Sequence, residues 1–146
     1  MQPKVGIILI NYKDYAKRFI EDCRNSMRVI DYPKDKYTVY IVDNATSVES
    51  QGYLKEMWPE AIILPNAENS GWGAGNNVGI KRATEDGCED IVLSNMDVYV
   101  TPEWLAELIS AAYSVQEIGI VQSKLFLHPP KPDGTFHINS VGNRFH

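Results

Sequence analysis

The stretch VGIILINYKDYAKRFIEDCRNSM, residues 5–27, decides the fold class. It opens with Val5–Ile10, a continuous apolar run rich in β-branched residues, which is typical of a strand buried on both faces. After Asp14, apolar residues recur at steps of three or four and predict a helix with one apolar face, formed by Ala16, Phe19, Ile20, Cys23, Met27 and Ile30. A buried strand followed by such a helix favours a parallel sheet with helices on both faces.

Strand and helix patterns alternate along the rest of the chain. Pro33 is expected to end the first helix, and Thr46 with Glu49 forms a T-x-x-E capping box for a second one. Apolar runs predict the later strands, at residues 37–42, 61–64, 90–93 and 118–122.

Two more helices and a hairpin complete the predicted order of elements. A helix is expected to follow the segment Asn69–Gly79, which is rich in glycine and asparagine, and to end at Gly87. Thr101 is expected to cap, and Pro102 to open, a further helix. Turn signals after Leu127 predict a hairpin or lid. We therefore expect an α/β core over residues 1–127 and a separate region over residues 128–146.

Composition and charge exclude several classes of protein. The chain has 146 residues, of which 44% are apolar and 23% charged, as in ordinary globular domains. Its net charge is −5 and its basic residues are scattered, so a nucleic-acid-binding surface is not expected. No apolar run reaches the roughly 18 residues that a membrane span needs, and no signal peptide begins the chain. A cytoplasmic protein is therefore expected.

The cysteines and histidines predict neither a disulfide framework nor a metal site. Cys23 and Cys88 form no CxxC pair, and both are expected to be buried, reduced thiols. The three histidines lie late in the chain, at spacings that would not bring them together around a metal ion.

Polar residues follow four of the predicted strands. They are Asn11-Tyr12, Asp43-Asn44, Asn66 with Glu68-Asn69, and Ser94-Asn95-Met96-Asp97. Ligands of parallel α/β sheets bind beyond the carboxyl ends of the strands. One polar loop would be ordinary, but four in succession, two of them with an aspartate, favour a binding site at this edge.

Two of these segments suggest a definite chemistry. The carboxylate of Asp43 can accept hydrogen bonds from a ribose or a base N–H, although Asp-Asn is also a common turn sequence. Asp97, with the amide oxygen of Asn95 nearby, offers oxygen ligands for Mg²⁺ or Mn²⁺, and such ions typically share their ligands with substrate phosphates. A turn that leads into the next helix is the alternative interpretation of Asn95–Asp97.

The glycine-rich segment admits two interpretations. Four glycines in the nine residues from Gly71 to Gly79 allow a ligand to approach the backbone closely, and the following helix N-terminus favours an anion such as a diphosphate. The same glycines also allow a helix to pack tightly against the sheet. The spacing matches neither the G-x-G-x-x-G dinucleotide motif nor a P-loop.

Taken in order, four segments resemble a known family. They are VGIILINY (residues 5–12), VDNAT (42–46), ENSGWGAGNNVGI (68–80) and LSNMDVYVTPEWL (93–105). This ordered set is similar to family-two glycosyltransferases of the rhamnosyltransferase-like kind. The resemblance runs from Val5 to the end of the chain and implies a Rossmann-like GT-A fold, an α/β fold with a mostly parallel sheet and helices on both faces.

The resemblance implies a role for individual residues. Nucleotide binding is implied for nine of them: Asn11, Tyr12, Asp43, Asn44, Asn69, Gly71, Trp72, Asn77 and Asn95. Asp43 would bond the base, and Asp97 would be the metal ligand for Mg²⁺ or Mn²⁺. The family's D-x-D motif is Asn-Met-Asp here, so Asn95 contributes at most a neutral oxygen.

The implied reaction transfers a sugar from a nucleoside-diphosphate sugar, UDP- or dTDP-linked, to an acceptor hydroxyl with inversion. A carboxylate must act as general base, and in the family it lies well downstream of the metal acid. The chain continues for 49 residues after Asp97, and the acids in that stretch are Glu103, Glu107, Glu117 and Asp133. None of them is assigned as the base. We expect the sequence to be the N-terminal portion of a longer enzyme, with 128–146 the incomplete start of its acceptor side.

The implied partners are an acceptor saccharide or lipid-linked saccharide, as in polysaccharide biosynthesis. The full-length enzyme would be cytoplasmic, at the inner face of the membrane where its acceptor requires it.

Three other functions use a sheet of this kind. A sugar nucleotidyltransferase would need a glycine-rich, arginine-containing loop after the first strand, where this chain has Asn11-Tyr12-Lys13. A non-catalytic or truncated nucleotide-binding module is favoured by Asn95 and by the missing base. A plain α/β domain with a packing-driven glycine segment also remains, because fold alone does not fix function.

Overall fold

The computed structural model describes residues 2–44, 47–127, 131–135 and 137–140. Packing divides the chain into two units, Met1–Pro102 and Glu103–His146, which we describe separately. The predicted division into a nucleotide-sugar-binding core over residues 1–127 and an acceptor-side region over residues 128–146 stays a prediction. The elements of the first unit are β1 (Val5–Asn11), α1 (Tyr15–Arg28), the 3₁₀ helix η1 (Lys34–Lys36), β2 (Tyr37–Asn44), α2 (Val48–Met57), β3 (Ile62–Asn66), α3 (Gly71–Glu85) and β4 (Asp90–Ser94).

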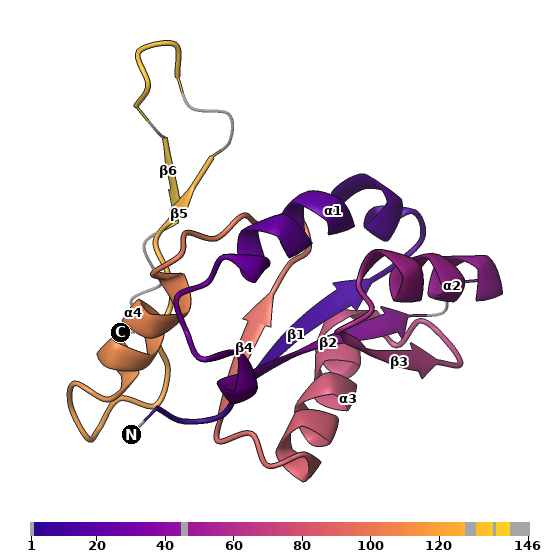
Figure 1. Ribbon diagram of the computed structural model, residues 1–146, viewed down its shortest axis with the longest axis horizontal. Helices are drawn as coiled ribbons and strands as arrows, with labels where there is room; N and C mark the ends of the chain where they lie inside the picture. The colour runs from indigo at the N-terminus through magenta and orange to yellow at the C-terminus, as the bar shows by residue number, and fades with distance from the viewer. Residues whose placement is uncertain (1, 45–46, 128–130, 136, 141–146) are drawn as a thin grey trace. The chain divides into compact units, whose positions relative to one another are not determined.

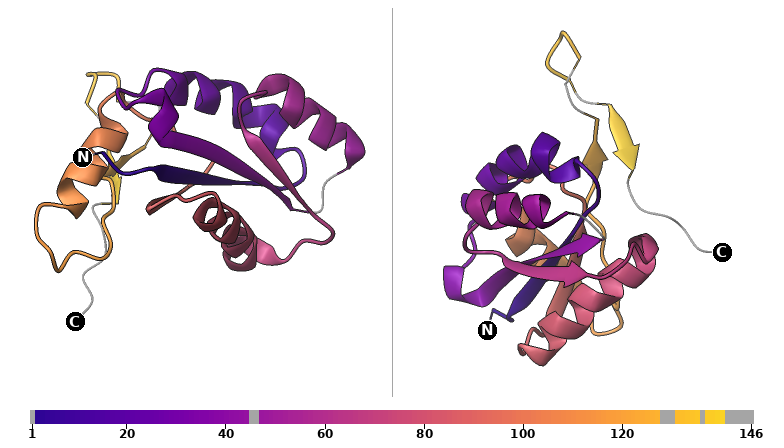
Figure 2. Two further views of the ribbon diagram at one scale, coloured as in Figure 1. Left: turned by 60° about the horizontal axis from the view of Figure 1, so that its bottom comes forward. Right: turned by 90° about the vertical axis from the view of Figure 1, so that its right-hand side faces the viewer.

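The first unit is a three-layer α/β structure. Its four strands are all parallel and lie in the order β3-β2-β1-β4. Helices α1 and α2 cover one face of the sheet, and α3 covers the other (Figures 1 and 2). The predicted parallel sheet with helices on both faces is confirmed.

Alternation along the strands sends successive side chains to opposite layers. Ile8, Tyr40 and Val42 form a buried cluster with Ala83 of α3 and the neighbouring Cys88. On the other face, four of the six side chains predicted to form the apolar face of α1 are buried within the helix: Ala16, Ile20, Cys23 and Met27. Phe19 is half-buried, and Ile30 is buried but lies beyond the end of α1 at Arg28. Both cysteines are free and buried, as expected.

The glycine-rich segment is itself helical, contrary to the prediction that the helix would follow it. Helix α3 begins at Gly71 and contains Gly73, Gly75 and Gly79. A Cβ on Gly75 would lie 3.3 Å from Cδ1 of Ile10, and a Cβ on Gly79 would overlap Cγ2 of Ile8. The contact with the sheet therefore outweighs the low helix propensity of glycine. The packing interpretation of these glycines holds for Gly75 and Gly79.

The predicted helix caps are mostly displaced by one or two residues. Ser47, not Thr46, is the N-cap of α2, and its Oγ accepts a hydrogen bond from the Ser50 amide at 3.2 Å; Thr46 itself lies outside the described residues. Asp14 precedes α1 as predicted but makes no side-chain capping bond. Serine is preferred to threonine at an N-cap, which agrees with the cap at Ser47.

The C-terminal end of α3 is held to the sheet by side-chain hydrogen bonds. Gly87 has a φ of 81°, the left-handed conformation expected of a residue that ends a helix, as predicted. Asp86 accepts hydrogen bonds from Tyr40 Oη of β2 at 2.9 Å and from Arg82 Nε at 3.0 Å. These bonds anchor the end of α3 to the middle of the sheet.

Acid is expected to remove the contribution of Asp86 to stability. The hydrogen bond from Tyr40, followed by those from Arg82, holds the pKa of Asp86 below its ordinary value. A carboxyl whose folded pKa is depressed stabilises the fold above its unfolded pKa of about 3.9 and loses that effect as the pH falls through the folded pKa. Urea midpoints at pH 7 and pH 3 should therefore differ less for Asp86→Asn than for the wild type. Glu85→Gln, which removes the neighbouring exposed acid of α3, should keep the wild-type difference; an equal loss in both variants would contradict the assignment.

The second unit contains α4 (Trp104–Ala112) and a two-stranded antiparallel sheet of β5 (Leu125–Phe126) and β6 (Ile138–Ser140). The prediction of a hairpin in this region is confirmed. Helix α4 begins after Glu103, so Thr101 is not its cap.

The predicted strand at residues 118–122 is wrong. These residues have no strand partner among the described elements, and Ile120 is 92% exposed. An apolar run becomes a strand only where another strand accepts its hydrogen bonds. None of the helices in the described part of the chain is long and apolar enough to cross a membrane.

Candidate functional site

The carboxyl edge of the four-stranded sheet gathers the polar residues that the sequence singled out. The strand order runs from β1 through β2 to β3 and then returns to place β4 on the other side of β1. In such sheets the crevice between the two strands where the order reverses is the usual ligand site. Here it is flanked by the residues that follow β1 and β4, with the ends of β2 and β3 alongside.

Asp43 is the buried acid of this edge. It lies at the end of β2 opposite Asn11 of β1 and is fully buried. Its Oδ1 accepts a hydrogen bond from Asn11 Nδ2 at 2.8 Å, whereas its Oδ2 is buried and has no hydrogen-bond partner among the described residues. A buried carboxylate oxygen without a partner is costly. Asp43 is therefore poised to accept a hydrogen bond from a ligand.

Asn11 is committed to holding Asp43 in place. Its amide also donates to Ser50 Oγ at 3.2 Å, and its Oδ1 accepts from the Ala16 amide in the first turn of α1 at 3.0 Å. The side chain of Asn11 is thus bonded to three protein groups. The predicted nucleotide-binding residue thus connects β1, β2, α1 and α2, and Ser50, which no sequence motif indicated, completes the arrangement.

Asn44 forms the centre of an asparagine cluster on the opposite face of the sheet. Its Nδ2 donates to Asn69 Oδ1 at 2.7 Å and to the Gly71 carbonyl at 3.3 Å. Its Oδ1 accepts from Asn66 Nδ2 at 3.1 Å and from the Ser70 amide at 3.3 Å. These bonds fix the start of α3 against the ends of β2 and β3. Asn44 and Asn69 thus lie at the predicted edge with their polar atoms bonded mainly to protein.

The first turn of α3 presents open backbone at this edge. Gly71 has a φ of 82°, a conformation that favours glycine, and a Cβ at Gly71 or Gly73 would meet nothing within 4 Å. Trp72 is 58% exposed and Asn77 is also exposed. Free amides in the first turn of a helix are suited to an anion. The first two glycines therefore leave room for a ligand, and the last two pack on the sheet.

Asp97 and Asn95 follow β4, where the sequence placed a metal site. Both are exposed, and Asn95 Oδ1 accepts a long hydrogen bond, 3.4 Å, from Trp72 Nε1. The Tyr15 hydroxyl donates to Asp97, and burial, followed by this bond, raises the pKa of Tyr15 to about 12. Tyr15 was not identified from the sequence, because an aromatic residue at a helix start has no distinctive spacing.

The donor set around Asp97 fits an ion that is shared with a ligand. No group of three His, Cys, Asp or Glu side chains in the described part of the chain could hold a metal by itself. Mg²⁺ and similar ions often bind through one or two carboxylates, with waters and phosphate oxygens as the other ligands. One exposed carboxylate is compatible with that arrangement and incompatible with a site made of protein ligands alone.

The turn after β1 carries backbone strain. Lys13 has a φ of 54° and is the one non-glycine residue in the described ranges with a positive φ. Its Nζ lies 5.2 Å from the ring centroid of Tyr12, which is 40% exposed. Strained residues of this kind concentrate at binding sites. Tyr12 is thus at the edge and accessible, as the predicted nucleotide contact requires.

Asp133, one of the four acids downstream of Asp97, is bonded within its own turn. Asp133 accepts hydrogen bonds from the Thr135 hydroxyl at 2.7 Å and the Thr135 amide at 2.9 Å, which hold the pKa of Asp133 below its ordinary value. A general base works best with a pKa near the working pH. Asp133 is therefore the acid of a turn, as its sequence context predicted.

Comparison with known proteins gives one family match. The sequence model of the family described as "Glycosyl transferase family 2" matches residues 4–125. A search of curated protein sequences finds no significant match.

Solved structures with the same fold come from enzymes longer than this chain. A mannosyltransferase from Pyrobaculum calidifontis, PcManGT, in complex with GDP-Man and Mn²⁺, superposes with a TM-score of 0.67 at 22% identity over 79% of this chain and 34% of its own. S. aureus TarS 1–349 superposes with a TM-score of 0.60 at 22% identity over 83% of this chain and 39% of its own. TarS 1–349 has also been solved with UDP and with UDP-GlcNAc. This chain thus spans well under half the length of these proteins.

Proposed function

The chain belongs to glycosyl transferase family 2 and has a GT-A fold, and from this premise we propose that it forms the donor-binding part of an inverting, metal-assisted glycosyltransferase. The donor is a nucleoside-diphosphate sugar, and the acceptor is a hydroxyl of a saccharide or a lipid-linked saccharide. The observation that carries the proposal is the buried Oδ2 of Asp43 at the carboxyl edge of the sheet, which has no hydrogen-bond partner in the part of the chain that the structure describes.

Asp43 recognises the base in this proposal. Uracil and thymine each present one ring N–H, and a carboxylate oxygen without a protein partner is a suitable acceptor for it. Asn11 acts on the nucleotide through Asp43, which it holds by the bond at 2.8 Å. Exposed Tyr12 lies beside the base or ribose.

The diphosphate lies between the first turn of α3 and Asp97. The open backbone at Gly73 donates to phosphate oxygens, and Gly71, whose own amide donates to Asn69 Oδ1 at 3.0 Å, leaves room for them. Asn44 and Asn69 keep that turn in place. Trp72, Asn77 and Asn95 contribute contacts from the surrounding surface. Asp97 holds Mg²⁺ or Mn²⁺, which supplies positive charge to a leaving diphosphate when bound. Tyr15 orients the Asp97 carboxylate by its hydroxyl.

Sugar transfer with inversion also needs a base on the acceptor side. The acceptor hydroxyl attacks the anomeric carbon from the face opposite the diphosphate, and its proton passes to a carboxylate. We propose that this carboxylate belongs to a part of the enzyme beyond residue 146. The solved relatives, of which the chain spans 34% and 39%, are long enough to include such a part. We propose a cytoplasmic site of action in polysaccharide biosynthesis, on the family resemblance alone.

Replacing Asp97 by asparagine tests the donor site. Calorimetric titration with UDP, dTDP and GDP, each with and without Mn²⁺, is expected to give binding that Mn²⁺ strengthens, and the variant should lose at least about 10-fold of this enhancement. Asp22→Asn, which removes an exposed acid from α1, should behave as the wild type. If the folded chain bound none of the three nucleotides, the donor-site proposal would be abandoned.

A nucleotide-binding module without catalysis is the second candidate. The hydrogen bonds from Thr135 that depress the pKa of Asp133 favour it, because they remove one of the few acids available as a base. Nucleotide binding by this chain is expected under both candidates. A test for catalysis distinguishes the two candidates. Release of free sugar from UDP- or dTDP-sugars, or transfer of the sugar to an added saccharide, would support the enzyme over the non-catalytic module.

A further inference from the structure

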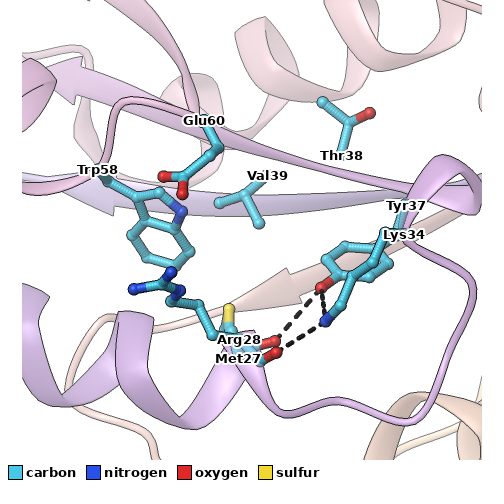
Figure 3. A pocket seen from close by; sticks show the side chains of 8 residues that line it. All are labelled: Met27, Arg28, Lys34, Tyr37, Thr38, Val39, Trp58 and Glu60. Atoms are coloured by element: carbon cyan, nitrogen blue, oxygen red, sulfur yellow. Dashed lines mark hydrogen bonds between the residues drawn. The ribbon is translucent and has the colours of Figure 1, made fainter.

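A cavity of about 470 Å³ opens in the first unit away from the carboxyl edge. Figure 3 shows the side chains that line it, which come from the end of α1, from η1, from the start of β2 and from the segment after α2. The lining residues are Met27, Arg28, Lys34, Tyr37, Thr38, Val39, Trp58 and Glu60. Its volume falls within the range of about 300–1,000 Å³ that is usual for small-molecule sites.

The cavity lies at the opposite end of the sheet from Asp43. Tyr37 begins β2 and pairs with Val5, the first residue of β1, whereas Asp43 pairs with Asn11 at the strand ends. Six residues at a rise of about 3.3 Å each separate Tyr37 from Asp43 by roughly 20 Å. A ligand in this cavity would therefore be distinct from a nucleotide at the carboxyl edge.

The inner wall of the cavity is apolar. Met27, Val39 and Trp58 are 1%, 6% and 4% exposed, so they are anchored in the core of the first unit. Fixed apolar side chains give a preformed surface that a ligand can cover without ordering the protein first. This wall is suited to an apolar body of small size.

The rim of the cavity carries an excess of positive charge. Arg28 and Lys34 line it together with one acid, Glu60, whose carboxylate is already paired with Arg24 Nη2 at 3.3 Å. A backbone hydrogen bond, followed by the charge of Arg24, holds the pKa of Glu60 below its ordinary value, so the acid stays ionised at neutral pH. Two positive charges remain after this pairing.

Arg28 is the cation left available for a ligand. Lys34 Nζ donates to the Arg28 carbonyl at 2.7 Å and to Tyr37 Oη at 2.8 Å, so its protons are largely used. The charge of Arg28 acts on Glu60, but its guanidinium makes no hydrogen bond with the residues that the structure describes, and its side chain is one of those that line the cavity in Figure 3. A guanidinium offers several donors in a plane that matches a carboxylate or a phosphate.

We propose that this cavity is a second ligand site, specific for a small organic anion in which a carboxylate or phosphate group is joined to an apolar body. Arg28 binds the anionic group, and the wall of Met27, Val39 and Trp58 covers the apolar body. Lys34 adds attraction through its charge. The site is independent of the nucleotide and of the proposed transfer reaction.

Nuclear magnetic resonance titration of the isotope-labelled chain tests the site. The probes are phenyl phosphate and benzoate, with inorganic phosphate as the charge-only control and benzyl alcohol as the apolar-only control. We expect both probes to shift the amide signals of Tyr37–Val39 and Trp58–Glu60 with dissociation constants on the order of millimolar, as suits ligands of about ten heavy atoms. Each control compound should bind at least about 10-fold more weakly.

Two variants complete the test. Arg28→Gln should weaken both probes about 10-fold, whereas Arg18→Gln, which removes the same charge from the exposed side of the same helix, should change nothing. Asp97→Asn should bind the probes as the wild type does, which would separate this site from the donor site. The proposal is overturned if neither probe shifts these signals, if a control compound binds as tightly as the probes, or if Arg28→Gln has no effect.

Discussion

Replacing Asp43 by asparagine is expected to weaken nucleotide binding about 10- to 100-fold and to leave the fold as stable as before or more stable. The variant loses a charge-assisted hydrogen bond to the base, and such bonds contribute about 1.5–3 kcal/mol. It also places an N–H group where the base presents its own. The folded protein, in contrast, no longer holds a carboxylate oxygen that is buried without a partner among the described residues, as Oδ2 of Asp43 is.

Opposite signs in the two measurements make this prediction specific. Calorimetry with UDP and urea unfolding of the same samples give the affinity and the free energy of unfolding. Asp35→Asn, which removes an exposed acid from η1 at the other end of the sheet, should leave the affinity unchanged. If Asp43→Asn lost stability and affinity together, Asp43 would be a structural residue that holds Asn11 and not a ligand contact.

Replacing Gly79 by alanine is expected to lower the free energy of unfolding by about 3 kcal/mol or more. The new Cβ would overlap Cγ2 of Ile8 and would lie 3.2 Å from Cγ2 of Val42, both in the centre of the sheet. Overpacking of a buried position typically costs about 1–3 kcal/mol, and here the side chains that obstruct it are β-branched and stiff. Since whole domains are stable by only about 5–15 kcal/mol, a large part of the stability would be lost.

Gly52→Ala is the matched control for this substitution. Gly52 lies within α2, and a Cβ there would meet nothing within 4 Å. This variant should gain about 0.5–1 kcal/mol, because alanine loses less conformational entropy than glycine in a helix. Thermal or urea unfolding compares the three proteins. Similar stabilities for Gly79→Ala and the wild type would mean that α3 can move away from the sheet without cost.

The sequence was sufficient to predict a strand or a helix wherever one local pattern determined that element. The apolar run of β1 and the spacing of Ala16, Ile20, Cys23 and Met27 correctly predicted a buried strand and a helix face. The extent of α3 could not be predicted in this way, because Gly75 and Gly79 become helical through contacts with Ile10 and Ile8, which are distant in sequence. The run at residues 118–122 has the composition of a strand, but no described strand pairs with it.

The sequence predicted where the candidate site lies, but not which side chains bond to one another within it. The polar residues after β1, β2 and β4 do meet at one edge, which topology alone requires. Their pairwise bonds could not be read from spacing. Asn11 and Asn44 were predicted to touch a nucleotide, yet their amides are used to hold Asp43 and the start of α3. The contribution of Tyr15, and the lack of a described partner for Oδ2 of Asp43, become visible only when the side chains are placed.

The position of β4 beside β1 sets the order in which a growing chain can assemble this edge. On the ribosome, β1 can pair with β2 once residue 44 has emerged. Its other neighbour, β4, whose Asp90 pairs with Val5, is completed some 50 residues later. At roughly 5–20 residues per second, the nascent chain therefore carries one open side of its central strand for several seconds. Unpaired strand sides of this kind attract other chains. The crevice between β1 and β4 is therefore the last part of the sheet to be completed.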